Sequence, residues 1–140
     1  MIDFRGVSFS YDGVTPALDG IDLNIEDGEF LCILGGNGSG KSTFAKHLNA
    51  LLQPDAGTVC VNGMDASDPE LVYDIRSTAG MVFQNPDDQL VATLVEDDVA
   101  FGPENLGVES PLIAQRVRGA LKAVGLVGFE RHETHALSGG

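Results

Sequence analysis

The sequence predicts an α/β fold organised around a glycine-rich loop between a buried strand and a helix. Residues 30–34 form a short, continuous apolar run, as expected of a parallel strand covered on both faces. Residues 35–42 then spell G-x-x-x-x-G-K-S, the pattern of a phosphate-binding loop. Apolar side chains recur after the loop at helical spacing, at Phe44, Leu48, Leu51 and Leu52.

The composition of the loop suits a polyphosphate, because many donors must converge on a small volume. Glycines leave no Cβ in the way of the backbone N–H groups, and the following helix directs its N-terminal dipole at the same place. Lys41 can reach the β- and γ-phosphates, and the Ser42 hydroxyl can bind Mg²⁺. The alternative, a glycine-rich turn with a surface lysine, fits the strand–loop–helix order less well. The candidate phosphate ligands are Gly35, Gly36, Asn37, Gly38, Ser39, Gly40, Lys41, Ser42 and Thr43.

Residues 1–30 predict an antiparallel sheet that precedes the loop. Residues 1–11 alternate between apolar and polar, with a change of phase at Gly6 that indicates a bulge. Asp12 and Gly13 form a turn, residues 18–25 a second strand, and residues 26–28 another turn.

Tyr11 lies at the end of the first predicted strand, where an exposed ring could stack on adenine. From the pattern alone, an ordinary tyrosine at a strand end is the better interpretation.

Between the loop and residue 89 we expect short elements. Residues 53–57 end the helix, residues 58–61 form a strand, and Asn62-Gly63 is a hairpin turn. A short helix over residues 69–76 and a strand over residues 79–83 follow. Gln84 then opens a polar stretch at the end of that strand, where α/β proteins place ligand contacts.

From Leu90 onward the pattern is helical. We expect Phe101-Gly102-Pro103 to break a first helix, and the acidic run 96–98 to be a solvated helix face without a metal. Ser110 and Pro111 are the expected N-cap and first position of a second helix, with Gly125 as its stop. The buried stripe of this helix is predicted at Ile113, Val117, Leu121 and Val124.

The composition narrows the function. A net charge of −13 over 140 residues argues against nucleic acid or anionic lipid as the main partner. Neither a bilayer-length apolar run nor a signal peptide is present, so we expect the chain in the cytosol, bound to a membrane only through a partner. Cys32 and Cys60 are interpreted as buried apolar residues, not as a disulfide or a metal pair.

Several stretches together resemble an ATP-binding subunit of ABC transporters. Tyr11 resembles the A-loop tyrosine, residues 35–42 the Walker A motif and Gln84 the Q-loop glutamine, while residues 137–140 resemble the start of the LSGGQ signature. Residues 83–107 are similar to the ATPase (A) component of energy-coupling factor transporters, the vitamin and metal-ion importers related to cobalt-transport ATPases.

The resemblance implies a role for each matching residue. Tyr11 would stack on adenine, and Gln84 would sense the γ-phosphate and Mg²⁺ and couple the site to the membrane subunit. Ser138, Gly139 and Gly140 would contact the nucleotide held by an opposite subunit. Gly36, where many relatives carry a larger residue, would loosen the loop.

The resemblance also implies an architecture and partners. Residues 1–30 would form the antiparallel β subdomain, residues 30–88 the P-loop core up to the Q-loop, and residues 89–140 the helical subdomain. The partners would be a transmembrane coupling (T) component, a substrate-binding (S) component and a second, identical or different ATPase subunit, with no nucleic acid. The location would be peripheral, on the cytoplasmic face of the cell membrane.

The sequence departs from the family pattern at residue 140, inside the signature. Walker B, with its aspartate and catalytic glutamate, is not among these residues, and no other carboxylate follows a run of four apolar residues. We therefore expect a fragment of a longer ATPase that binds ATP and Mg²⁺ but hydrolyses ATP slowly or not at all. The alternatives are a soluble ABC protein that moves no solute and a P-loop phosphotransferase.

Overall fold

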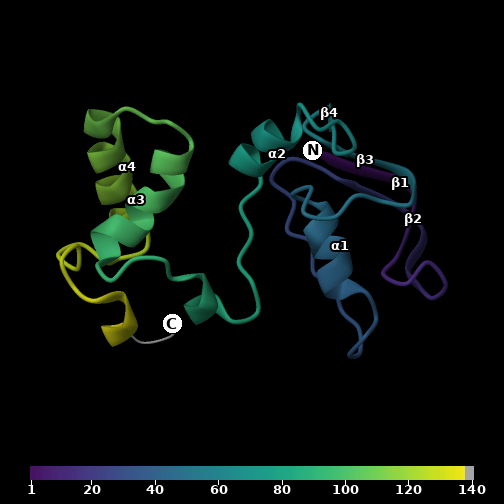
Figure 1. Ribbon diagram of the computed structural model, residues 1–140, viewed down its shortest axis with the longest axis horizontal. Helices are drawn as coiled ribbons and strands as arrows, with labels where there is room; N and C mark the ends of the chain where they lie inside the picture. The colour runs from purple at the N-terminus through teal and green to yellow at the C-terminus, as the bar shows by residue number, and fades with distance from the viewer. Residues whose placement is uncertain (138–140) are drawn as a thin grey trace. The chain divides into compact units, whose positions relative to one another are not determined.

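The computed structural model describes residues 1–137 (Figure 1). The described chain divides into two compact units, the first Met1–Met81 and the second beginning at Val82. Strands and helices share the first unit, whereas the second contains helices and loops. Each unit has its own apolar core. None of the helices in the described part of the chain has the length and hydropathy that a bilayer crossing requires.

The first unit is built on an antiparallel sheet of four strands in the order β2-β1-β3-β4. Their bounds are β1 Ile2–Ser10, β2 Pro16–Ile25, β3 Ala56–Val61 and β4 Met64–Asp65. The register between β1 and β2 shifts after Phe4, so the expected bulge near Gly6 is confirmed. Asn62 and Gly63 both have positive φ and join β3 to β4, which confirms the predicted hairpin turn.

Two short helices complete this unit, α1 (Lys41–His47) and α2 (Val72–Thr78). Phe4 of β1 stacks on Phe44 of α1, with ring centroids 4.6 Å apart. Ile75 of α2 is fully buried in the same cluster. The alternation along β1 and β3 thus supplies one apolar sheet face for the helices to cover. The buried residues of this core are Phe4, Val7, Leu18, Phe44, Ala50, Val59, Val61, Ala66 and Ile75.

Helix α1 is shorter than the apolar spacing predicts. Its C-terminal end is capped by a Schellman-type pair of hydrogen bonds. Leu51 N–H donates to Lys46 O at 2.9 Å, and Ala50 N–H donates to His47 O at 3.3 Å. Ala50 takes the left-handed conformation, with φ 53°. The predicted continuation to Leu51 and Leu52 was therefore wrong, because this cap turns the chain before Leu51 can join the buried face.

Two predicted strands, residues 30–34 and 79–83, are irregular segments. Phe30 is 93% exposed and Leu34 is 87% exposed. A parallel strand forms only when neighbouring strands take up its backbone hydrogen bonds. No strand among residues 1–137 pairs with either segment, so the apolar composition alone does not make them strands. Cys32 is consequently exposed, contrary to prediction, and Cys60 in β3 is half-buried; both of these described cysteines are free thiols.

The second unit contains α3 (Val95–Asn105), α4 (Ser110–Ala123) and two 3₁₀ turns, η1 (Pro86–Gln89) and η2 (Thr134–Ala136). Helices α3 and α4 lie side by side (Figure 1). Leu94 forms a β-bridge with Glu133, which ties the start of α3 to the chain before η2. The buried residues between the helices are Val95, Ala100, Val117 and Leu121.

Three details of this unit differ from prediction. Pro103 does not break α3, because it lies in the last turns of the helix, where its missing N–H removes a single intrahelical bond. The N-cap of α4 is Glu109, one residue before the predicted Ser110. Val124 is 69% exposed, because α4 ends in a Schellman-type cap at Gly125 and Leu126 takes the place in the core instead.

We predict that Gly57→Ala will destabilise the first unit by about 3 kcal/mol, because Gly57 lies opposite the bulge with φ 82° and a Cβ there would meet the carbonyl oxygens of Arg5 and Gly6. Gly13→Ala is the matched control: φ is 72° there but nothing lies within 4 Å, so we expect a loss of about 1 kcal/mol. Urea unfolding measures both. Equal losses would show that the close approach of β3 to β1 is unimportant.

Candidate functional site

The glycine-rich loop closes around the side chain of its own lysine. The Lys41 ammonium donates to the carbonyl oxygens of Gly35, at 2.9 Å, and Gly36, at 2.6 Å. The Ser39 hydroxyl lies 3.4 Å from the same nitrogen, and the Ser39 N–H donates to Gly36 O at 3.3 Å. The positive charge is therefore held at the centre of the loop by neutral oxygens, which a phosphate can replace.

Gly40 joins this loop to α1 and to the sheet. It is the N-cap of α1, with φ 85°. A Cβ at this position would meet the carbonyl oxygen of Ala17 on β2 and would lie 3.3 Å from Leu18 Cδ2. Only glycine lets the loop pass so close to β2 in this conformation.

The first turn of α1 presents unused backbone donors. Within the described residues, no side chain caps it, and the turn carries no acidic residue. The N–H groups of a helix start without a cap are available to an anion. Ser42 lies in this turn, next to Lys41, so its hydroxyl shares the same end of the helix.

Tyr11 is tied to this helix. Its ring is 63% exposed, while its hydroxyl lies 3.2 Å from Thr43 Oγ1 in a hydrogen bond that either group can donate. Thr43 is 6% exposed, so the hydrogen bond joins an exposed tyrosine to a buried residue of α1. The structure thus brings together two parts of the predicted site that are far apart in the sequence.

The other predicted site residues do not lie in the first unit. Gln84 belongs to the second unit, where it is exposed next to Phe83, whose N–H donates to Gln89 Oε1 at 2.9 Å. Ser138, Gly139 and Gly140 lie outside the described residues.

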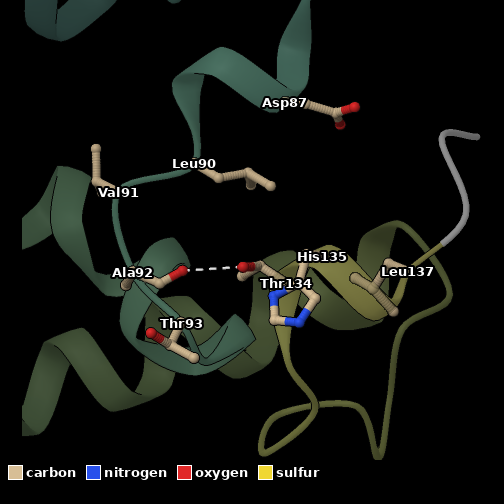
Figure 2. Close-up of a pocket in the computed structure, with 8 residues that line it drawn as sticks. All are labelled: Asp87, Leu90, Val91, Ala92, Thr93, Thr134, His135 and Leu137. Atoms are coloured by element: carbon tan, nitrogen blue, oxygen red, sulfur yellow. Dashed lines mark hydrogen bonds between the residues drawn. The ribbon is translucent and has the colours of Figure 1, made fainter.

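A second candidate site is a cavity of about 500 Å³ in the second unit (Figure 2). Thr134 closes one side by donating to Ala92 O at 2.9 Å, the contact dashed in Figure 2. The wall mixes apolar side chains with the Asp87 carboxylate and the His135 imidazole, so it suits a peptide segment with both apolar and polar groups. The lining residues are Asp87, Leu90, Val91, Ala92, Thr93, Thr134, His135 and Leu137.

Sequence patterns missed two contributions. His47 is fully buried at the end of α1 and contacts Thr43, although the predicted stripe passed over it; its spacing of four residues from Thr43 was the available signal. Asp98 lies in the acidic run predicted to be a solvated face, yet its carboxylate accepts the N–H groups of Val91, at 2.8 Å, and Ala92, at 3.1 Å.

The described residues contain no cluster of three or more His, Cys, Asp or Glu side chains able to hold a metal ion.

Comparison with known proteins agrees with this geometry. The ABC transporter family model matches residues 18–140. The energy-coupling factor transporter ATP-binding protein EcfA1 of Clostridium novyi (strain NT) is 54% identical over 144 residues, covering 100% of this chain and 51% of the relative. Among solved structures, cbiO1 from Clostridium perfringens, part of the ABC transporter complex cbiONQ, has a TM-score of 0.86 at 36% identity, covering 98% of this chain and 55% of that one.

A further structure extends the likeness. A dimeric ATP-binding cassette bound to ADP and Pi in a post-hydrolysis state has a TM-score of 0.81 at 29% identity, covering 99% of this chain and 64% of that one. The predicted α/β fold class of the ABC ATPases is confirmed. The chain spans about half the length of the curated relative it matches.

The loop after Tyr11 supports a prediction on pH. Asp12 accepts the N–H groups of Thr15, at 2.7 Å, and Val14, at 2.9 Å, and the Ser10 hydroxyl at 2.8 Å. These hydrogen bonds, led by that from Thr15, hold the pKa of Asp12 below its ordinary value of 3.8.

Because the folded state has the lower pKa, the unfolded state binds more protons as the pH falls below about 4. The stabilisation from Asp12 is thus complete above the ordinary value and is lost as the pH falls towards the folded pKa. We predict that Asp12→Asn lowers the urea midpoint at pH 7 and that the difference from the parent narrows at pH 3. A difference that does not change with pH would contradict this.

Proposed function

Because the chain belongs to the ABC transporter family, we propose that it is the nucleotide-binding part of an importer ATPase subunit. The observation that carries the proposal is the Lys41 ammonium, held inside the loop by the carbonyl oxygens of Gly35 and Gly36. Phosphate oxygens can exchange for these neutral acceptors and form stronger, charge-assisted hydrogen bonds. Uncapped N–H groups in the first turn of α1 would add further donors.

Mg²⁺ fits the residues present, although few of them can bind it. The Ser42 hydroxyl, in the first turn of α1, would be a ligand from the chain, and the family order assigns the Gln84 amide oxygen as another. Mg²⁺ usually completes its shell with water and substrate phosphates, so a sparse protein contribution suits it. When bound, Mg²⁺ would neutralise charge on the β- and γ-phosphates.

Tyr11 would stack on the adenine ring. Its exposed face offers stacking area, while its hydroxyl is anchored to Thr43 in the helix that follows the phosphate loop. Residues 35–43 and Tyr11 would therefore contact the two ends of one nucleotide.

The remaining roles follow the family order. We assign residues 1–30 to the β subdomain, residues 30–88 to the P-loop core and residues 89–140 to the helical subdomain. Gln84 would sense the γ-phosphate, and residues 138–140 would contact the nucleotide of a second ATPase subunit. The dimeric cassette among the structural relatives supports pairing of this kind.

For these 140 residues we propose binding without turnover. No carboxylate in the sequence ends a strand-length apolar run, so no Walker B residue is available to orient the attacking water. Hydrolysis, and the import of a vitamin or metal ion that it would drive, are proposed for the longer subunit at the cytoplasmic face of the membrane. Transmembrane coupling and substrate-binding components would be its partners. The structural relative described as part of the ABC transporter complex cbiONQ supports assembly with further subunits.

The cavity of the second unit is our candidate for the contact with the transmembrane coupling component. Its lining comes from the segments that follow Gln84 and precede Ser138. A helix or loop inserted there would therefore touch both segments, which adjoin in sequence the residues proposed to contact nucleotide, Gln84 and Ser138.

We predict that the 140-residue chain binds ATP with Mg²⁺ in calorimetric titration, and that Lys41→Ala weakens this affinity by roughly 100-fold, because two charge-assisted hydrogen bonds are lost. Lys46→Ala, in the last turn of the same helix, is the matched control and should change the affinity less than about threefold. Phosphate release measured beside the titration should stay at background. An unchanged affinity in the Lys41 variant would refute the assignment of the loop.

A second prediction concerns the partner contact. Val91→Asp places a charge in the cavity at a side chain that is already 57% exposed, so folding should be unaffected. Co-purification of the longer subunit with its membrane component should fall by about tenfold, as expected for one unfavourable buried charge in an interface. Val127→Asp, at a 66% exposed residue outside the cavity lining, should leave the complex intact. If co-purification fell equally in both variants, or fell in neither, this surface would not be the contact with the membrane component.

A further inference from the structure

Four residues from β1, its turn and α1 form a closed ring of contacts, in which three links join side chains and the fourth joins the His47 side chain to the backbone carbonyl of Thr43. Tyr11 Oη lies 3.2 Å from Thr43 Oγ1, and His47 Nδ1 lies 2.8 Å from Thr43 O. Phe9 completes the ring, because it packs edge-on against both Tyr11 and His47. Two of the four residues come from the end of β1 and its turn, and two come from α1.

His47 is the buried member of this ring. Its side chain is fully buried, and its Nδ1 must be the donor because Thr43 O is a carbonyl acceptor. Its Nε2 has no hydrogen-bond partner among the described residues. A buried polar atom without a partner costs free energy that an apolar side chain of similar size would avoid. Packing alone therefore gives no reason for a histidine at this position.

Phe9 lies in contact with both His47 and Tyr11. Its ring centroid lies 5.1 Å from that of His47, at an interplanar angle of 74°, and 4.9 Å from that of Tyr11, at 89°. Edge-to-face pairs at these separations have a preferred orientation, so each ring restricts the next. The Tyr11 side chain is thus held at its ring by Phe9 and at its hydroxyl by Thr43.

We propose that His47 is a positioning residue for the aromatic ring that stacks on the base. Through Thr43 and Phe9 it holds Tyr11 in one orientation relative to the loop at residues 35–43. It would thereby set how much of the nucleotide affinity comes from the base, without touching the nucleotide itself. This inference rests on the proposed nucleotide-binding function, and it adds a residue that acts on the base end only.

The test compares two ligands, ATP and inorganic tripolyphosphate, each with Mg²⁺, titrated into the 140-residue chain. Tripolyphosphate has the charged tail but no base, so it reports on the loop alone. His47→Leu is expected to weaken ATP binding roughly fivefold, a fraction of one base–aromatic stack, and to leave tripolyphosphate binding within about twofold. Tyr11→Ala should weaken ATP binding at least as much, and the double variant should be no weaker than Tyr11→Ala alone.

Val59→Ala is the matched control, since Val59 is 1% exposed in the same core but takes no part in the ring. It should lower the urea midpoint while leaving the ratio of the two affinities unchanged. If His47→Leu does not fold, Phe9→Leu interrupts the same ring from the strand side and carries the same expectation.

Tyrosine fluorescence gives a second readout. The chain has no tryptophan and two tyrosines, so in a Tyr73→Phe background all emission comes from Tyr11. ATP should quench this emission and tripolyphosphate should not, and His47→Leu should reduce the quenching at saturating ATP.

The outcomes separate the two proposals. Failure of the parent chain to bind either ligand would overturn the proposed function. Binding of both ligands by the parent, with equal weakening or no weakening of the two in His47→Leu, would leave the loop assignment intact and overturn the role of His47.

Discussion

The packing of α1 on the antiparallel sheet is the constraint on which the candidate site depends. The stacked rings of Phe4 and Phe44 hold the helix against β1, and Gly40 allows the start of the helix to approach the backbone of β2. The loop, its lysine and the first-turn donors are consequently presented from a fixed support. A phosphate site needs such preorganisation, because its donors repel one another until the anion arrives.

The loop adopts this geometry without a strand before it. Residues 30–34 are exposed and irregular, yet Lys41 is still held by the carbonyl oxygens of Gly35 and Gly36. Local hydrogen bonds and the contact of Gly40 with β2 therefore suffice to shape the loop. The apolar side chains of Phe30 and Leu34 are therefore exposed and take no part in shaping the loop.

Tyr11 shows how the antiparallel sheet contributes to a candidate site formed mainly by α1 and the loop before it. Asp12 fixes the turn that follows the tyrosine, Thr43 and Phe9 contact the tyrosine itself, and His47 packs against Phe9. A change in the sheet or in the buried end of α1 would thus alter the orientation of Tyr11, and with it the proposed contact with the base, without altering the phosphate loop. In the proposed site, the affinity for the base and the affinity for the phosphates would therefore be set by different residues.

Sequence alone determined the features that depend on short-range chemistry. The loop pattern, the bulge near Gly6, the Asn62-Gly63 hairpin and the stop of α4 at Gly125 each follow from backbone conformations that a few neighbouring residues permit. The resemblance to the ABC ATPases rested on the same kind of evidence, and the comparisons confirmed it.

Only the tertiary structure decided which apolar segments are paired and buried. Residues 30–34 have the composition of a strand but no partner within the described chain, and Val124 has the spacing of a core residue but lies beyond a cap. The hydrogen bond between Tyr11 and Thr43 likewise joins two residues that no sequence period relates. Sheet pairing and side-chain contacts of this kind are set by distant parts of the chain, so a local pattern cannot specify them.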